Sequence, residues 1–413
     1  MTGDESMTLH FATPSYSSGT KGSQKGHVVI EPRTQEEFNR MRGVLRGAWV
    51  LVNGKSGGWG IAHGEKATEN RHKIIEANAE AAKYNREHAG QDGERKKIDE
   101  TTPALFYDEM VQAGVLGFIQ AADVPIRALY DRDVVFNKNA SFDNLPAVPS
   151  ILLNAEQYDR IKTLAQQRRN IELEFDIRNY FKMGPVTYNN VVAKIEGKKY
   201  PNEYVVVGAH IDAFDTGTGG VDCGSGVSAV MEAARMIMAS GAKPDRTIIF
   251  VLFAAEEFGL LGSQAWAKAH EDIMPKISNV FNRDGGPLPY TSFNVPQSLL
   301  KEYEKIVKPI QELYPDYDFK LTAITPFKKP TRLGGNDSTT FSVAGVPAVQ
   351  MADWADPKGY NFSYNEIWHT ERDTFNKSIA EYQEQAAASL AIMVLGTANA
   401  SKQWPRNEVF LAE

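Results

Sequence analysis

The chain has 413 residues, a length typical of two domains. It is 42% hydrophobic and 23% charged with a net charge of −7, which argues against a general affinity for nucleic acid. It contains no apolar run of about 18 residues or more, so the sequence predicts no membrane span. Its single cysteine, Cys223, excludes an internal disulfide framework and leaves the compartment open.

Residues 1–26 are rich in Ser, Gly and Thr and are predicted to form a flexible or extended lead-in. This stretch lacks the apolar core of a secretory signal. We therefore expect either a cytoplasmic protein or a truncated form of an exported one.

Residues 27–168 are predicted to form a first, smaller domain. In chain order its elements are a strand over 45–54, an exposed helix or loop over 66–100, a helix leading into a strand over 107–123, and a strand followed by a helix capped near Asn154.

Residues 169–413 are predicted to form a second domain, in which strands alternate with helices. The pattern predicts strands over 171–181, 189–197 and 203–212, a helix over 224–241, a strand over 246–255, a helix over 259–271 and a strand ending at Asp284. Such alternation indicates an α/β fold with a mixed sheet between layers of helices. In these folds ligands bind beyond the carboxyl ends of the strands.

Acidic and imidazole side chains stand at the ends of these strands and in the turns beside them. They are His210, Asp212, Asp222, Glu256, Glu257, Asp284 and His369. We expect them at one edge of the sheet, and imidazole together with carboxylate suits zinc and its first-row neighbours.

The adjacent pair Glu256 and Glu257 fits a site with two metals. Two zinc ions about 3.5–4 Å apart need a bridging carboxylate, and each also needs a histidine and an acidic ligand. A further carboxylate is needed as general base. Successive residues of an extended strand point in opposite directions, so one Glu can bind metal while its neighbour faces the water.

The order of these residues resembles the co-catalytic dizinc exopeptidases, the aminopeptidases related to glutamate carboxypeptidase and plasma glutamate carboxypeptidase. The resemblance covers about residues 185–400 and includes "GGNDSTTFSVAGVPAV". The stretches "VLGFIQAADVP" and "VPSILLNAEQ" resemble the β-rich protease-associated domain that many members insert. Family members usually begin with a helix and an edge strand ahead of that domain. The resemblance therefore implies that the N-terminal part of the catalytic domain is missing from this chain.

The resemblance also implies a role for each metal ligand. His210 and Asp284 would bind the first zinc, and Glu257 and His369 would bind the second. Asp222 would bridge the two ions. Other divalent first-row metals suit the same donors.

The same resemblance assigns Glu256 and Asp212 to the catalytic machinery. Glu256 would take a proton from the metal-bridging water and deliver it to the leaving amine. Asp212 would orient the imidazole of His210. The family usually has a cis peptide after the bridging residue, which here places it between Asp222 and Cys223. Cys223 itself is expected to be a small buried residue.

Four more residues carry alternatives. Asp373, four residues after His369, is expected to support that ligand or cap a helix rather than bind metal, and Asp337 receives no definite role. Arg332 could meet a substrate carboxylate or lie at the surface, and Tyr364 could lie near a developing oxyanion. The remaining histidines are expected to be non-catalytic: His10, His27, His63, His72, His88 and His270.

The sequence thus favours a zinc-dependent exopeptidase acting on peptides, with aminopeptidase activity as the main hypothesis. A carboxypeptidase or dipeptidase of the same family is the first alternative. A non-catalytic receptor or scaffold on the same fold is the second. We expect no nucleic-acid partner, and a homodimer is left open.

Overall fold

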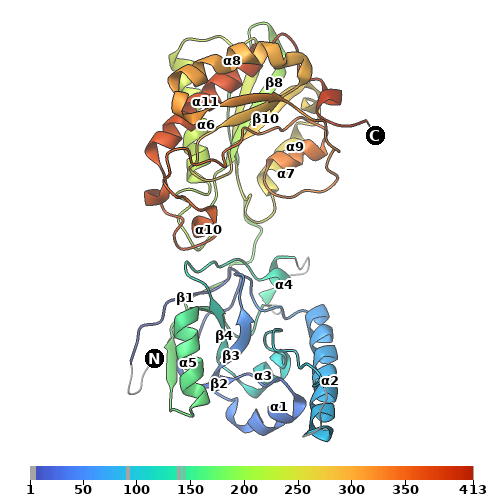
Figure 1. The fold of residues 1–413 in the computed structure, drawn as a ribbon, viewed down its shortest axis with the longest axis vertical. Coiled ribbons are helices and arrows are strands. Elements are labelled where there is room, and N and C mark those ends of the chain that lie inside the picture. Colours follow the sequence, from blue (N-terminus) through green and yellow to red (C-terminus); the bar gives the residue numbers. More distant parts are fainter. Residues whose placement is uncertain (1–5, 90–93, 137–140, 143–144, 413) are drawn as a thin grey trace. The chain divides into compact units, whose positions relative to one another are not determined.

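The computed structural model describes residues 6–89, 94–136, 141–142 and 145–412. The chain separates into two compact units, Met1–Pro185 and Val186–Glu413, called here the first and second unit (Figure 1). In the described part of the chain, no helix combines the length and the apolar character needed to cross a bilayer.

The first unit is built on a six-stranded sheet in the order β1-β5-β4-β3-β2-β6. The four inner strands run parallel, and the two edge strands are antiparallel to their neighbours. The strands are β1 (Phe11–Ala12), β2 (Gln24–Ile30), β3 (Ala48–Lys55), β4 (Gly117–Ala122), β5 (Ser150–Asn154) and β6 (Glu172–Phe175).

Helices connect these strands, because parallel strands need crossover segments. They are α1 (Gln35–Met41), α2 (Glu65–Glu87), α3 (Tyr107–Ala113), α4 (Arg132–Val135) and α5 (Ala155–Gln166). The predicted cap of the last helix is confirmed, since the Asn154 side chain accepts hydrogen bonds from the backbone N–H groups of Glu156 and Gln157 (2.9 and 3.2 Å). The unit is α/β, whereas a β-rich domain was expected. Its assignment as a protease-associated domain stays a prediction.

The limits of the first unit differ from the prediction at both ends. The stretch predicted as lead-in carries β1 and the start of β2, and the Phe11 ring packs against Phe175 with centroids 5.1 Å apart. The predicted boundary after residue 168 also lies too early. Strand β6 pairs with β2, and Leu173 and Ile177 are buried in the core of the first unit, so this segment belongs there.

The second unit has a mixed four-stranded sheet in the order β10-β8-β9-β7. Strands β10, β8 and β9 are parallel, and β7 runs antiparallel to β9 at the edge. The bounds are β7 (Val191–Ile195), β8 (Tyr200–His210), β9 (Arg246–Phe253) and β10 (Ile277–Asn282), with a separate parallel pair β11 (Ser292–Val295) and β12 (Lys320–Ala323). Every residue of β9 is buried, as predicted for a strand covered on both faces.

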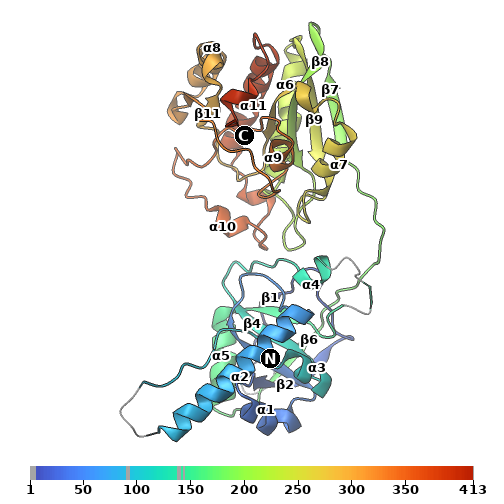
Figure 2. The ribbon, with the colours of Figure 1, turned by 90° about the vertical axis from the view of Figure 1, so that its right-hand side faces the viewer.

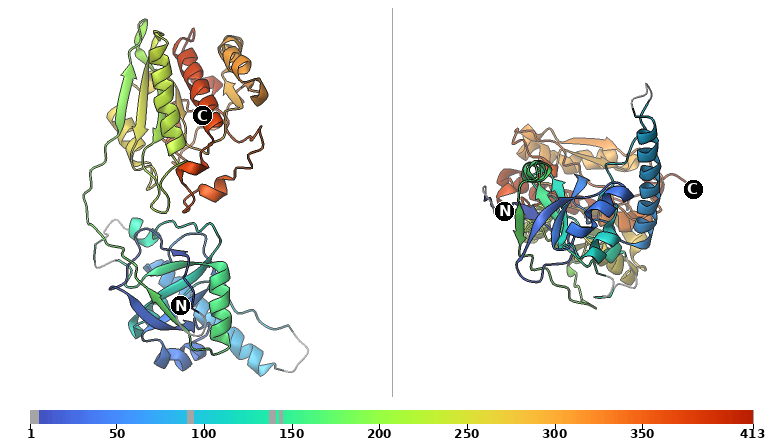
Figure 3. Two further views of the ribbon diagram at one scale, coloured as in Figure 1. Left: turned by 90° about the vertical axis from the view of Figure 1, so that its left-hand side faces the viewer. Right: turned by 90° about the horizontal axis from the view of Figure 1, so that it is seen from below.

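Helices cover both faces of this sheet, and the pleat divides the core between them. On one face Val205 and Val207 pack with α6, α11 and α8; α6 and α11 contact the sheet, and α8 lies beyond α11 (Figures 2 and 3). On the other face Val206 packs with α7 and α9. The helices are α6 (Gly224–Ala239), α7 (Leu261–Ala269), α8 (Leu300–Leu313), α9 (Ser338–Val343), α10 (Tyr364–Ile367) and α11 (Ala380–Ala398).

A histidine–aspartate pair lies in the first unit. His63 Nε2 is 3.1 and 3.0 Å from the two carboxylate oxygens of Asp131. The Asp133 carboxylate accepts from the backbone N–H groups of His63 and Gly64 (2.6 and 3.0 Å). Burial disfavours the charged imidazole, but the hydrogen bond to Asp131 and the charges of both aspartates outweigh it and raise the pKa of His63.

We expect this pair to make the stability of the first unit depend on pH. The folded state holds the His63 proton more tightly than the unfolded state, so the stabilisation is complete below the ordinary pKa of 6.5. It is lost as the pH rises through the raised pKa of the folded state. The substitution His63→Gln should flatten this dependence, measured by hydrogen exchange of first-unit segments over a pH series. His72→Gln is the control, because His72 is 58% exposed. Equal pH dependence in H63Q and the parent chain would contradict the expectation.

Candidate metal centre and active site

The carboxyl ends of three parallel strands bring the predicted ligands to one edge of the second sheet. His210 is the last residue of β8, Glu257 follows β9 after a short turn, and Asp284 follows β10. In two groups, the candidate ligand atoms lie within 4.8 Å of one another. The first group consists of His210, Asp222, Cys223 and Asp284. The second group consists of Asp222, Glu257 and His369. Asp222 belongs to both groups, which is the position of the predicted bridging carboxylate.

In the first group, His210 Nε2 lies 3.0 Å from Asp222 Oδ1 and 3.4 Å from Asp284 Oδ1. His210 Nδ1 lies 3.0 Å from the backbone oxygen of Asp212 and 3.7 Å from its carboxylate. A proton on Nδ1 would leave Nε2 free to bind a metal. Asp212 thus contacts the imidazole that it was predicted to orient, and the closer contact comes from its backbone.

Cys223 is geometrically close to the first group, but its thiol is engaged elsewhere. It is 1% exposed and donates a hydrogen bond to the backbone oxygen of Arg283 (3.1 Å). Burial raises the pKa of the thiol to about 11, so in the metal-free protein the thiol keeps its proton and this hydrogen bond. The Asp222–Cys223 peptide bond is cis, as the resemblance implied.

In the second group, His369 Nε2 lies 2.8 Å from Glu257 Oε2. Asp222 Oδ2 accepts a hydrogen bond from the Tyr364 hydroxyl (3.1 Å). The second oxygen of Glu257, Oε1, is buried and has no hydrogen-bond partner within the described residues. A buried acceptor of this kind beside an imidazole and a shared carboxylate suits a divalent cation.

Two carboxylates hold the loops that present these groups. The Asp212 carboxylate accepts from the backbone N–H groups of Glu256 and Glu257 (3.1 and 3.2 Å). The Asp373 carboxylate accepts from the N–H groups of Val221 and Asp222 (2.8 and 3.3 Å). Asp373 therefore supports the loop of the candidate bridging residue Asp222, whereas the sequence had suggested that it supports His369.

Contrary to the prediction from the sequence, Glu256 and Glu257 do not lie on an extended strand. Strand β9 ends at Phe253, and Ala255 has a φ of 55°, in the left-handed region that an alanine rarely adopts. Glu256 and Glu257 thus follow a turn, and the opposite directions of successive strand residues do not explain their placement. A strained backbone beside candidate catalytic groups is typical of functional sites.

The acidic groups of this site crowd one another. Burial raises the pKa of Glu256 to about 9, with Asp284 adding to the effect. Burial and the charge of Asp222 do the same for Glu257. Asp337 is fully buried, which raises its pKa to about 7. Carboxyl groups held so close together indicate a site that is completed by positive charge.

An ion pair between Arg283 and Asp353 lies beside Asp284, and no pattern in the sequence predicts it. Arg283 is 1% exposed, and its Nη1 lies 2.5 Å from Asp353 Oδ2. Its Nη2 donates to the backbone oxygens of Gly286 and Leu288 (3.0 and 2.6 Å). The guanidinium therefore ties down the loop that follows the candidate ligand Asp284.

We expect Arg283→Met to lower the free energy of unfolding of the second unit by about 3–5 kcal/mol, because it leaves the Asp353 carboxylate, which is only 14% exposed, without its cation. The double variant Arg283→Met/Asp353→Leu removes both charges and should regain part of that loss. Chemical denaturation of the metal-free protein measures both variants. A double variant no more stable than the single one would show that the ion pair is not the cause.

Comparisons with known proteins match the region that carries this site. Residues 190–395 match peptidase family M28. Carboxypeptidase Q of Rattus norvegicus is 27% identical over 330 residues, covering 74% of this chain and 63% of that protein. The chain thus spans less than two thirds of the length of this relative. The probable glutamate carboxypeptidase AMP1 of Arabidopsis thaliana is 26% identical and covers 58% of this chain and 37% of that protein.

Solved structures share the fold. A peptidase M28 precursor from Shewanella amazonensis superposes with a TM-score of 0.59 at 21% identity, covering 96% of this chain and 79% of the other. A zinc aminopeptidase from Bacillus subtilis gives a TM-score of 0.50 at 17% identity, covering 98% and 82%. The match of residues 190–395, together with the paired ligand groups, identifies this chain as a member of peptidase family M28, in agreement with the predicted resemblance to the dizinc exopeptidases.

Proposed function

We propose that this chain is a zinc-dependent exopeptidase and that it removes residues from the amino end of peptides. The observation that carries the proposal is the position of Asp222, whose carboxylate belongs to both groups of candidate ligands. Such sharing is what a pair of metal ions requires. Family membership and the imidazole and carboxylate donors support the choice of zinc.

His210 and Asp284 would hold one zinc ion, Glu257 and His369 the other, and Asp222 both. When bound, the two ions would polarise the peptide carbonyl and make water more acidic.

The remaining side chains would move protons and orient groups. Glu256 is 9% exposed, and the charges of Asp284 and His210 influence its pKa, so it lies close to the candidate ligands. It would take a proton from the attacking water and deliver it to the leaving amine. The Tyr364 hydroxyl, 3.1 Å from Asp222 Oδ2, is placed to donate to developing negative charge.

The charge balance favours the amino end of the substrate. Six acidic side chains surround the site: Asp212, Asp222, Glu256, Glu257, Asp284 and Asp337. Two zinc ions bring about four positive charges, which leaves a negative balance that attracts an ammonium group. Arg283 is buried against Asp353 and so is not available to a substrate carboxylate. Arg332, considered for that role, is exposed.

A panel of free and blocked dipeptides, assayed with and without a chelator, tests the proposal. We expect cleavage of free and C-terminally amidated peptides, no cleavage of N-acetylated ones, and loss of turnover with the chelator. The reverse preference would establish the carboxypeptidase alternative, which the names of the relatives favour. A folded protein that contains no zinc and cleaves none of the peptides would favour a non-catalytic receptor or scaffold.

A further inference from the structure

An aromatic ring lies against the imidazole of the last candidate ligand. Phe214 is 4% exposed, and its ring stacks on His369 with centroids 4.2 Å apart and an interplanar angle of 18°. The same ring stacks on Phe258 at 5.6 Å and 25°. Phe214 belongs to none of the hydrophobic clusters found among the described residues. Its ring is therefore buried beside the site, outside those clusters.

The three stacked rings come from the three segments that carry the second ligand group. Phe214 lies in the loop that leads from β8 to Asp222, and Phe258 directly follows Glu257. His369 is itself the third ligand of the group. The ring of Phe214 thus connects the loops of all three ligands at the place where their side chains converge.

His369 needs such support, because its backbone has a φ of 55°, which is unfavourable for a residue with a side chain. Trp368 also stacks on the imidazole, with centroids 4.4 Å apart. Rings on the imidazole restrict its rotation and keep Nε2 at 2.8 Å from Glu257 Oε2. The stacking therefore fixes the direction of the nitrogen that would bind the metal.

We propose that Phe214 is a positioning residue that sets the affinity of the Glu257–His369 side for its zinc ion. The inference rests on the proposed function, since it requires a cation at that side. Groups that orient metal ligands typically change metal affinity by about 10–100-fold when they are removed. Phe214→Leu, which keeps an apolar side chain and removes the ring, should therefore weaken one of two zinc sites by about 10–100-fold.

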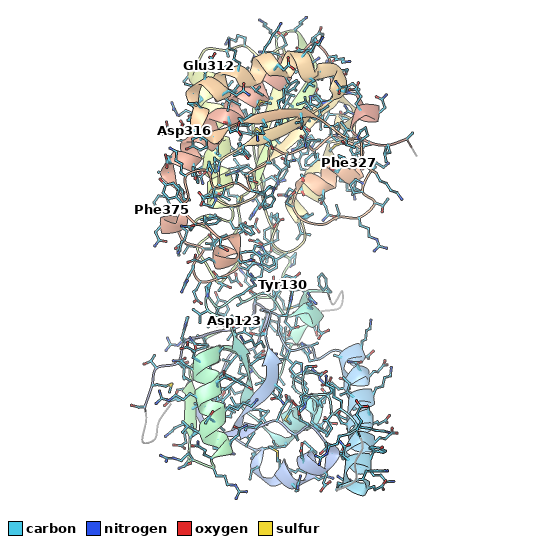
Figure 4. The ribbon with its side chains drawn as sticks, in the orientation of Figure 1. Asp123, Tyr130, Glu312, Asp316, Phe327 and Phe375 are labelled. Atoms are coloured by element: carbon cyan, nitrogen blue, oxygen red, sulfur yellow. The ribbon has the colours of Figure 1, made fainter. Side chains whose placement is uncertain are left out.

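The experiment is a competition titration of the full chain with a zinc indicator, which resolves the first and second equivalents. Phe214→Tyr keeps the ring and should keep the affinity of the parent chain. The matched control is Phe293→Leu, because Phe293 is 1% exposed in the core of the same unit and packs on Phe281 at 5.6 Å. An exposed control is Phe375→Leu, at a residue that is 84% exposed and lies on the outside of the second unit (Figure 4).

Weakening of one equivalent in F214L alone supports the inference. Two unchanged equivalents in F214L, or the same weakening in F293L, overturn it and leave the proposed function intact. A folded parent chain that binds no zinc overturns both. Circular dichroism checks folding, and if F214L does not fold, Phe214→Met is titrated in its place. The visible spectrum of the cobalt-loaded protein gives a second readout, because a misplaced imidazole alters the ligand field of one ion only.

Discussion

Glu256→Gln is expected to lower kcat by about 10²–10⁴-fold while both zinc ions stay bound. The amide has the size of the carboxylate but cannot accept the proton of the attacking water. Glu256 has no place in either group of candidate ligands, so its substitution should leave metal binding intact. Steady-state kinetics on the best dipeptide, together with zinc analysis of the same sample, measure both parts.

The neighbouring residue provides the matched control. Glu257→Gln changes the same type of side chain one position later, but Glu257 contacts His369 at 2.8 Å and belongs to the second ligand group. It should lose one zinc equivalent in addition to activity. If E256Q lost the metal and E257Q kept it, the two roles would be exchanged. Normal turnover of E256Q would remove the general base from the proposal.

Three of the five candidate ligands could be expected from the sequence because of a simple geometric rule. The carboxyl ends of parallel strands meet at one edge of a sheet, so the residues at or just after the ends of β8, β9 and β10 had to lie close together. His210, Glu257 and Asp284 are such residues. Asp222 and His369 required the resemblance, because a turn and a late loop carry no such constraint.

The orientation of the glutamate pair could not be predicted in this way. It depends on the left-handed turn at Ala255 and on the two hydrogen bonds from Asp212. Neither feature leaves a periodic pattern in the sequence. The contacts of Phe214 and Arg283 could not be predicted for the same reason. Phe214 packs on His369, and Arg283 pairs with Asp353, so both contacts depend on segments that are distant in the sequence.

The boundary of the first unit shows that local sequence patterns do not predict which strands pair. Alternation predicted a strand from residue 171, and β6 confirms that a strand is present there. The pattern does not say which sheet the strand joins. Pairing with β2 decides that, and it moves the segment from the second unit into the first.

Removal of the metals is expected to destabilise the second unit, and the loss should grow as the pH rises. In the metal-free protein, burial together with neighbouring carboxylates raises the pKa values of Glu256 and Glu257 to about 9, from an ordinary value of 4.5. Between these values the folded metal-free chain binds more protons than the unfolded chain. Its stability therefore falls as the pH rises from about 4.5 to about 9.

Bound cations reverse this dependence, because they occupy the place of those protons and bind more tightly when the ligands are deprotonated. The difference between the loaded and the chelated protein should thus be small near about pH 5 and large near about pH 9. Thermal unfolding with and without a chelator, combined with hydrogen exchange resolved by segment, measures it. Segments of the first unit serve as the internal reference. In the chelated double variant Glu256→Gln/Glu257→Gln, the fall with pH should be reduced, since neither amide titrates. A chelator effect of the same size at every pH would mean that these carboxylates are not the groups that the cations neutralise.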